Sequence, residues 1–183
     1  MRRRRLLVLV LASILAAGVA ACGGDDNGGA AADTSSTTAQ GPQKSVRDVN
    51  VLDPKNLKEK PSIAVPDGKP PATLQQLDLV RGTGPTARDG DKVSVQYVGV
   101  AWSTGQEFDA SWDRNQPFDF TLGAGDVIQG WDRGVAGMKV GGRRVLVIPP
   151  GLAYGAQGSQ PAIGPNETLV FVVDLKKVTP ASG

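Results

Sequence analysis

Three features of the sequence predict an α+β domain in which an antiparallel sheet of five or six strands wraps around one short helix. Beyond residue 73, apolar residues alternate with polar ones in several short segments, as half-buried strands require. Stretches rich in glycine and proline separate these segments, as turns and loops do. One segment, residues 126–138, instead has apolar residues at the three- and four-residue spacing of an amphipathic helix.

The strands are predicted from this alternation and from the turns that end them. Leu77 and Leu79 alternate with Gln76 and Asp78, and the glycine-rich turn 81–85 ends that strand. Further strands are expected at residues 92–102, 106–109, 118–120, 143–148 and 168–178.

The helix is predicted to be about three turns long, with Ile128, Trp131, Val135 and Met138 on one apolar face. Asp126 is expected to cap its first turn, and the glycine pair 141–142 is expected to end it. Three glycines within the segment each weaken a helix by about 0.5 to 1 kcal/mol relative to alanine. Packing of the apolar face must therefore hold this helix in place.

All nine aromatic residues lie between Tyr97 and Phe171. One sheet and one helix share a single large apolar face, so these rings by themselves are more often plain core than a binding site. The loop 149–166 favours a site, because Tyr154 lies in it and an exposed loop is an unusual place for a packing aromatic.

The amino-terminal residues 1–21 have the three parts of a secretory signal. Four arginines precede an apolar run at residues 6–15, and small residues lead to Cys22, the only cysteine in the chain. The stretch 19–22, Val-Ala-Ala-Cys, resembles a bacterial lipobox, which implies that the Cys22 thiol is linked to diacylglycerol and anchors the protein to the membrane. The alternative is a buried structural thiol, which the neighbouring Gly-Gly-Asp-Asp makes difficult.

Two further segments precede the domain, which is expected at residues 73–179. Residues 22–44 contain no aromatic or large aliphatic residue and are predicted to form a disordered tether. Residues 45–72 contain several valines, but five prolines break them into extended pieces. This segment is either a spacer or an arm laid along the domain.

Charge and composition exclude several classes of function. Without the four arginines of residues 1–21, the chain has 16 basic and 18 acidic residues, so no excess of positive charge favours nucleic-acid binding. The pairs Arg143-Arg144 and Lys176-Lys177 are expected to be solvated surface. With no histidine and one cysteine, histidine triads, histidine metal sites and thiolate clusters are excluded, and neither a metal nor a cofactor is predicted.

Six blocks of the sequence resemble the FKBP-type peptidyl-prolyl cis-trans isomerases, in the order and at the spacing of that family. The blocks cover residues 95–99 (VQYVG), 108–111 (FDAS), 114–118 (RNQPF), 127–131 (VIQGW), 153–155 (AYG) and 168–171 (TLVF). The resemblance extends from about residue 74 to residue 178 and implies an FKBP-like fold.

The resemblance also implies a site. Trp131 would form the floor of a hydrophobic pocket that receives a proline ring, with walls from Tyr97, Phe108, Phe118, Val127, Ile128, Tyr154, Ile163 and Phe171. The backbone N–H of Ile128 and the phenol of Tyr154 would bind peptide carbonyls. Asp109, held by Tyr97 and Arg114, would lie near the rotating amide. The alternative for Asp109 and Arg114 is an ion pair that only stabilises a loop.

The loop after Tyr154 departs from the family pattern. Where many members carry a histidine and two large aliphatic residues, this chain has Ser159, Ala162 and Ile163. The departure bears on sequence preference and on the affinity for FK506-like or rapamycin-like macrolides, which the resemblance implies as ligands.

Two functions are therefore considered. In the first, the protein is an isomerase anchored outside the cytoplasm through Cys22, and it speeds X-Pro isomerisation while exported proteins fold. In the second, it is a non-catalytic module that holds proline-containing partners in the same pocket. Retention of Asp109, Tyr154 and Trp131 favours the first. A solute-capture lipoprotein is disfavoured because 183 residues are too few for two lobes.

Overall fold

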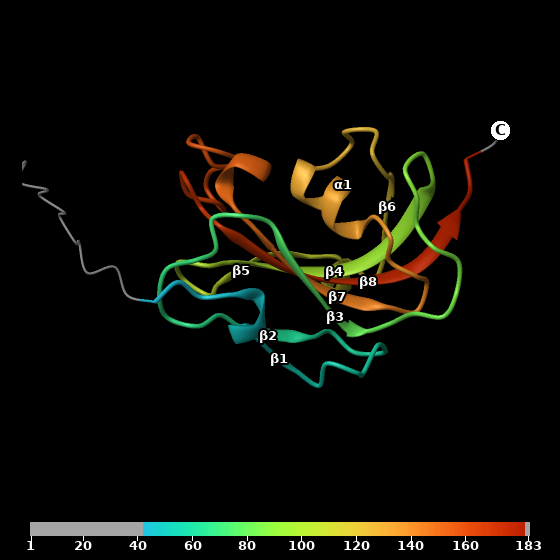
Figure 1. Ribbon diagram of the computed structural model, residues 1–183, viewed down its shortest axis with the longest axis horizontal. Coiled ribbons are helices and arrows are strands. Elements are labelled where there is room, and N and C mark those ends of the chain that lie inside the picture. Colours follow the sequence, from blue (N-terminus) through green and yellow to red (C-terminus); the bar gives the residue numbers. More distant parts are fainter. Residues whose placement is uncertain (1–41, 182–183) are drawn as a thin grey trace, which may run out of the picture. The chain divides into compact units, whose positions relative to one another are not determined.

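The computed structural model describes residues 42–181, and its main element is a six-stranded antiparallel sheet with one α-helix on it (Figure 1). The signal segment 1–21, Cys22 and residues 23–41 of the predicted tether lie outside the described residues. No helix within residues 42–181 is both long enough and apolar enough to cross a membrane. The predicted α+β class, with its sheet and single short helix, is confirmed.

The strands lie close to their predicted positions. Their order across the sheet is β3 (Gln75–Val80), β7 (Arg143–Ile148), β8 (Leu169–Thr179), β4 (Lys92–Ala101) and β5 (Glu107–Ala110), and β6 (Phe118–Thr121) pairs with β4. The long strands β4 and β8 pair along their whole length in the middle of the sheet. Two short 3₁₀ helices, η2 (Ser111–Arg114) and η3 (Pro150–Leu152), follow β5 and β7.

The two faces of the sheet carry separate hydrophobic cores. On one face the sheet packs against helix α1 (Gln129–Val135), which lies above the sheet in Figure 1. On the other face a second cluster forms, because β4 and β8 are apolar on both sides over part of their length. Its buried members are Val46, Val49, Val51, Val98, Val100, Trp102, Ala110, Val145, Val147, Val170 and Val172.

The amino-terminal arm covers this second face. It consists of η1 (Val46–Asp48) and the antiparallel pair β1 (Asn50–Leu52) and β2 (Ser62–Ala64). The valines of η1 and β1 are buried against the sheet, and the indole Nε1 of Trp102 donates a hydrogen bond of 2.9 Å to Gly68 O. Of the two interpretations left open by the sequence, the structure shows the arm laid along the domain.

Helix α1 is shorter than predicted, with seven residues. Ile128 occupies the N-cap position without a side-chain hydrogen bond, and Asp126 instead accepts from Thr121 N at 3.1 Å, so the predicted Asp126 cap is wrong. The helix ends at Val135, before Gly137, whose positive φ of 77° lets the chain turn away. The glycine pair at 141–142 is therefore not its end.

Arg143 and Arg144 were expected at the surface, and this expectation is wrong. Both side chains are buried, because β7 lies between β3 and β8 and the arm and α1 cover its two faces. Arg143 donates to Asp174 from Nε at 2.6 Å and from Nη2 at 2.7 Å, and Arg144 Nε lies 2.5 Å from Asp78 Oδ1. Burial of the two charges is tolerated because each has a carboxylate partner. The second basic pair, at 176–177, is exposed as expected.

Candidate functional site

A cavity of about 270 Å³ opens between the sheet and the start of α1. It is lined by Tyr97, Phe108, Asp109, Phe118, Asp126, Val127, Ile128, Trp131, Tyr154 and Phe171. Its lining comes from four strands, β4, β5, β6 and β8, and from helix α1. Segments more than seventy residues apart therefore meet at the cavity. All of these residues except Asp126 are among the site residues that the sequence indicated.

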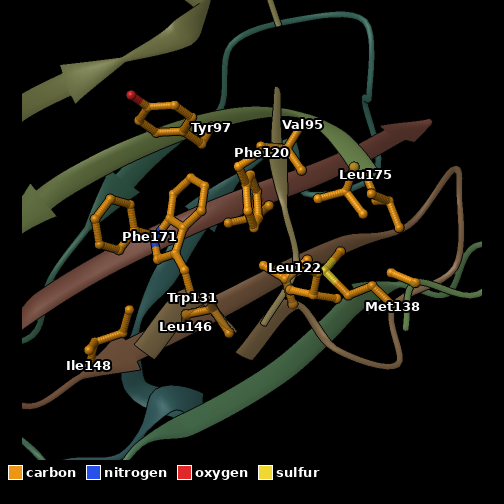
Figure 2. Close-up of a cluster of buried hydrophobic side chains, with 14 of the residues drawn as sticks. Val95, Tyr97, Phe120, Leu122, Trp131, Met138, Leu146, Ile148, Phe171 and Leu175 are labelled. Carbon is orange, nitrogen blue, oxygen red and sulfur yellow. The ribbon is translucent and has the colours of Figure 1, made fainter. Parts of the chain in front are cut away.

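Trp131 forms the floor of the cavity and is held by aromatic rings on several sides (Figure 2). The rings of Tyr97 and Phe171 meet the indole edge to face, with centroids at 5.0 and 5.2 Å. Phe120 packs at 5.6 Å, so the floor has little freedom to tilt. The indole Nε1 has no hydrogen-bond partner among the described residues and lies beside the Phe171 ring (Figure 2).

Gly99 on β4 makes room for the aromatic wall. A Cβ at this position would lie 2.7 Å from Phe108 Cζ and 2.7 Å from Phe171 Cε1, so any side chain here would force the rings to shift. The absent side chain lets the two rings meet edge to face at 5.5 Å between centroids. Glycine at this position therefore preserves the packing of the aromatic wall.

A bulge explains how adjacent residues of β5 both reach the cavity. Gly99 pairs with Asp109 and Val100 pairs with Glu107, which leaves Phe108 as the extra residue. Such a bulge re-aims side chains next to a site. Both Phe108 and Asp109 consequently line the cavity wall.

Asp109 is held at the polar edge of the cavity by two donors. The phenol of Tyr97 donates a hydrogen bond to Asp109 Oδ2, and Arg114 Nη1 donates to Oδ1 at 2.5 Å. Arg114 Nη2 also donates to the Tyr97 oxygen at 2.9 Å, which closes a ring of three groups. Asp109 is thus fixed in position by its neighbours.

Burial and the hydrogen bond to Asp109 raise the pKa of Tyr97 to about 12, although Arg114 acts in the opposite direction. The hydrogen bonds to Asp109 and Tyr97 raise the pKa of Arg114 above its already high ordinary value. At neutral pH, the phenol is therefore a neutral donor and the guanidinium a permanent cation.

Ser111 is a supporting residue that the sequence reasoning missed. Its fully buried Oγ accepts from Tyr97 N at 2.8 Å and donates to Gln96 Oε1. This bond joins η2, which carries Arg114, to the strand that carries Tyr97. The small polar residue at the end of the FDAS block is the only signal for it in the sequence.

Two donors at the cavity have no acceptor within residues 42–181. These are the backbone N–H of Ile128, just before α1 begins, and the phenol of Tyr154, whose residue is 42% exposed on the loop after η3. Both residues line the cavity, so both donors are available to a bound molecule. Asp126 also lines it, although the sequence suggested only a capping role there.

Two predicted binding residues do not line this cavity. Ile163 is buried in the core cluster with Trp131, and its N–H and C=O both pair with Ser159, at 2.8 and 2.9 Å. Arg114 lines an adjacent hollow of about 280 Å³, which shares Phe118 with the main cavity. Ala162 is exposed. Within residues 42–181, no group of three histidine, cysteine or acidic residues is placed to hold a metal ion.

Comparison with known proteins identifies relatives of this chain. Residues 84–176 match the family model of the FKBP-type peptidyl-prolyl cis-trans isomerases. An FK506-binding protein from Streptomyces anulatus is 60% identical over 121 residues, which cover 66% of this chain and 98% of that protein. A probable FK506-binding protein from Corynebacterium glutamicum is 52% identical over 117 residues, 64% of this chain and 97% of that protein.

Solved structures show the same likeness. The crystal structure of FkpA from Escherichia coli superposes with a TM-score of 0.54 at 44% identity, over 60% of this chain and 49% of that one. The crystal structure of AtFKBP13 has a TM-score of 0.54 at 37% identity, over 57% of this chain and 91% of that one.

Proposed function

Because this chain belongs to the FKBP-type peptidyl-prolyl cis-trans isomerases, we propose that it works outside the cytoplasm as a lipid-anchored isomerase for exported proteins. Its peptidyl-prolyl isomerase activity follows from its family. We assign the isomerase site to the aromatic cavity around Trp131, because it has two free donors and a fixed carboxylate at its edge. The location of the protein outside the cytoplasm and its action on exported proteins are what we propose.

The reaction requires rotation about an X-Pro bond and no covalent bond changes. The barrier of roughly 20 kcal/mol arises from amide resonance, which is lost when the amide is twisted. The planar amide is the more polar form, so a dry aromatic cavity disfavours it relative to the twisted form. Donors fixed around the twisted peptide lower the barrier further.

The described residues supply each of these functions. The proline ring rests on Trp131 between the walls of Tyr97 and Phe171, which exclude water. The free donors of Ile128 and Tyr154 bind peptide carbonyls and hold the chain on either side of the rotating bond. Asp109, fixed by its two donors, lies at the open edge next to the amide. The aromatic floor thus binds the substrate, and the polar edge holds its twisted state.

The isomerase function is tested with a fragment that begins at residue 42. We expect it to accelerate cis to trans conversion of X-Pro peptides, and Asp109→Ala to lower kcat/KM while the thermal unfolding temperature falls only slightly. A fragment that binds proline peptides without speeding their isomerisation would instead support the non-catalytic binding module.

The anchor is supported by the sequence of residues 1–22, with its basic start, its apolar run and its lipobox-like end at Cys22. We expect the full chain in bacterial cells to be found in the membrane fraction, and Cys22→Ser to move it to the soluble fraction. Retention of the variant in the membrane, with residues 1–21 still attached, would show that no lipid on Cys22 is needed.

Macrolide binding is proposed because the relatives from Streptomyces and Corynebacterium carry the name FK506-binding protein. Ala162 is exposed on the loop after η3 and does not line the cavity itself. It would therefore act on a ligand that extends past the rim, to which it offers less apolar area than the branched residue that many family members carry. A loss of some 40 to 60 Å² is worth about 1 to 1.5 kcal/mol, or about tenfold in affinity. Ala162→Ile should therefore tighten FK506 binding in calorimetry, and an unchanged Kd would show that the loop departure has no effect on this ligand.

A further inference from the structure

The arm contacts the segment that carries the polar edge of the site. Lys60 Nζ lies 2.7 Å from Glu107 Oε1 on β5 and 2.7 Å from Asp113 Oδ1 on η2. Glu107 directly precedes the bulged stretch that ends in Asp109, and Asp113 directly precedes Arg114. One ammonium group of the arm therefore bridges both ends of the segment 107–114.

Lys60 neutralises two carboxylates that lie close together. Burial lowers the pKa of Lys60, but the hydrogen bonds to Asp113 and Glu107 outweigh this effect and the net direction is upward. The pKa of Asp113 is lowered, chiefly by its hydrogen bond to Lys60, and both Glu107 and Arg114 also act on it. Asp113 is thus within electrostatic reach of the guanidinium that holds Asp109.

We infer that Lys60 is a positioning residue for the isomerase site, because it occupies two carboxylates that would otherwise compete with Asp109 for Arg114. The Arg114 side chain is 51% exposed and has room to swing. The inference rests on the isomerase activity and on the role proposed for Asp109. It also assigns a task to the arm, since residue 60 lies outside the matched family segment 84–176.

Loss of the Lys60 bridge should disturb the ring of hydrogen bonds that Tyr97, Asp109 and Arg114 form at the cavity edge. Arg114 donates both to Asp109 and to the phenol of Tyr97. If Arg114 turns toward free carboxylates at 107 and 113, Asp109 keeps one donor instead of two and its carboxylate is no longer fixed. The aromatic floor is unaffected, so substrate binding should change less than the rate of rotation.

The test compares Lys60→Gln with Lys58→Gln in the full-length protein. Lys58 lies in the same arm, is exposed, and its ammonium has no partner among the described residues. We expect Lys60→Gln to lower kcat by about two- to fivefold, which corresponds to about 0.4 to 1 kcal/mol, with little change in KM. Lys58→Gln should match the wild type, and 1 M NaCl should narrow the difference between the two variants.

Removal of the competing carboxylates shows whether Lys60 keeps Arg114 on Asp109 or only anchors the arm to the segment 107–114. The triple variant Lys60→Gln, Glu107→Gln, Asp113→Asn should recover the wild-type kcat, because no competitor for Arg114 remains. Asp113→Asn alone should also keep it, and this variant tests the inference even where Lys60→Gln is poorly folded.

Three results would overturn the inference while leaving the isomerase function intact. These are a Lys60→Gln rate equal to that of Lys58→Gln, a triple variant as slow as Lys60→Gln, and a loss in Asp113→Asn as large as in Lys60→Gln. An inactive wild-type protein would instead contradict the proposed function itself.

Discussion

At the scale of single residues, Tyr97 connects the two halves of the site. Its ring packs edge to face on Trp131, its phenol donates to Asp109 and accepts from Arg114, and its backbone N–H donates to Ser111. The apolar floor and the polar edge therefore share one side chain. By contrast, Tyr154 stands apart at the rim, and its phenol has no partner within the described residues.

Tyr154→Phe is predicted to lower kcat/KM by about two- to tenfold, which corresponds to one hydrogen bond of roughly 0.5 to 1.5 kcal/mol. The ring remains, so the cavity keeps its shape. The thermal unfolding temperature should not change, because the lost hydroxyl bonds no described residue. An unaltered kcat/KM would show that this phenol does not bind the substrate.

The pH dependence follows from Tyr97 and from the absence of histidine. Turnover should be nearly constant between about pH 6 and 8, because the Tyr97 phenol stays neutral and Arg114 stays charged in this range. A steep change of kcat near neutral pH, with constant KM, would show that an ionising group other than Tyr97 and Arg114 takes part in the reaction.

The free energy of unfolding should respond at higher pH. The pKa of Tyr97 is about 12 in the folded protein against an ordinary value of 10.0, so the unfolded chain loses this proton first. The contribution of Tyr97 is fully present below about pH 10 and is lost as pH rises toward 12. Urea unfolding from pH 8 to 11 measures the decline, and Tyr97→Phe should decline less steeply.

At the scale of elements, α1 is held by close contact with β7. Gly130 and Gly134 face Ile148 and Leu146, and a Cβ on Gly134 would lie 2.8 Å from two methyl carbons of Leu146. The glycines that weaken the helix locally thus allow its backbone to approach the sheet. Arg144 strengthens the contact, because its Nη1 donates to Gly134 O at 2.8 Å and to Ala136 O at 3.2 Å.

Gly130→Ala is predicted to destabilise the domain by about 1 to 3 kcal/mol, although alanine favours an isolated helix by roughly 0.5 to 1 kcal/mol. Its Cβ would lie 2.8 Å from Ile148 Cδ1 in a fully buried contact. Gly151→Ala is the control, since nothing lies within 4 Å of a Cβ there. Urea unfolding compares the two, and equal stability would show that α1 can move off the sheet without cost.

At the scale of the whole described chain, the sheet has a core on each face, and the arm supplies part of the second one. Arg143 links the arm to the sheet, because its guanidinium pairs with Asp174 and also donates to Asp53 O and Glu59 O, each at 3.4 Å. Without the arm, an apolar sheet face and a buried charge would meet water. We therefore expect the arm and the catalytic domain to unfold together.

Val51→Ala is predicted to lower the free energy of unfolding by about 1.5 kcal/mol, at roughly 0.8 kcal/mol for each buried methyl or methylene group. Leu52→Ala, the next residue on the same strand, should change it by less than about 0.5 kcal/mol. The two side chains differ in exposure, 8% against 57%. Fluorescence and circular dichroism should report one common transition, and separate transitions would mean that the arm unfolds independently.

The sequence by itself determined the strands of the six-stranded sheet and part of the apolar face of the helix, whereas β1 and β2 were not predicted. The family resemblance indicated most of the cavity lining. Alternation along β3 and the four-residue spacing of Trp131 and Val135 are properties of a few neighbouring residues, and burial of one face follows from them directly. Met138, which was predicted on the same helical face, is buried but lies beyond the end of α1. The six blocks of the family then assigned Asp109, Tyr154 and Trp131 to one pocket, where the structure places them.

Only the tertiary structure decided where the charged residues lie. The sequence predicted Arg143 and Arg144 at the surface. They are buried because β7 lies between two strands, with the arm on one face and α1 on the other. Similarly, Asp126 is drawn away from the helix by a backbone N–H of β6, and Lys60 meets carboxylates 47 and 53 residues away. Such partners are set by strand order and chain crossing, which are non-local, so no local pattern in the sequence could reveal them.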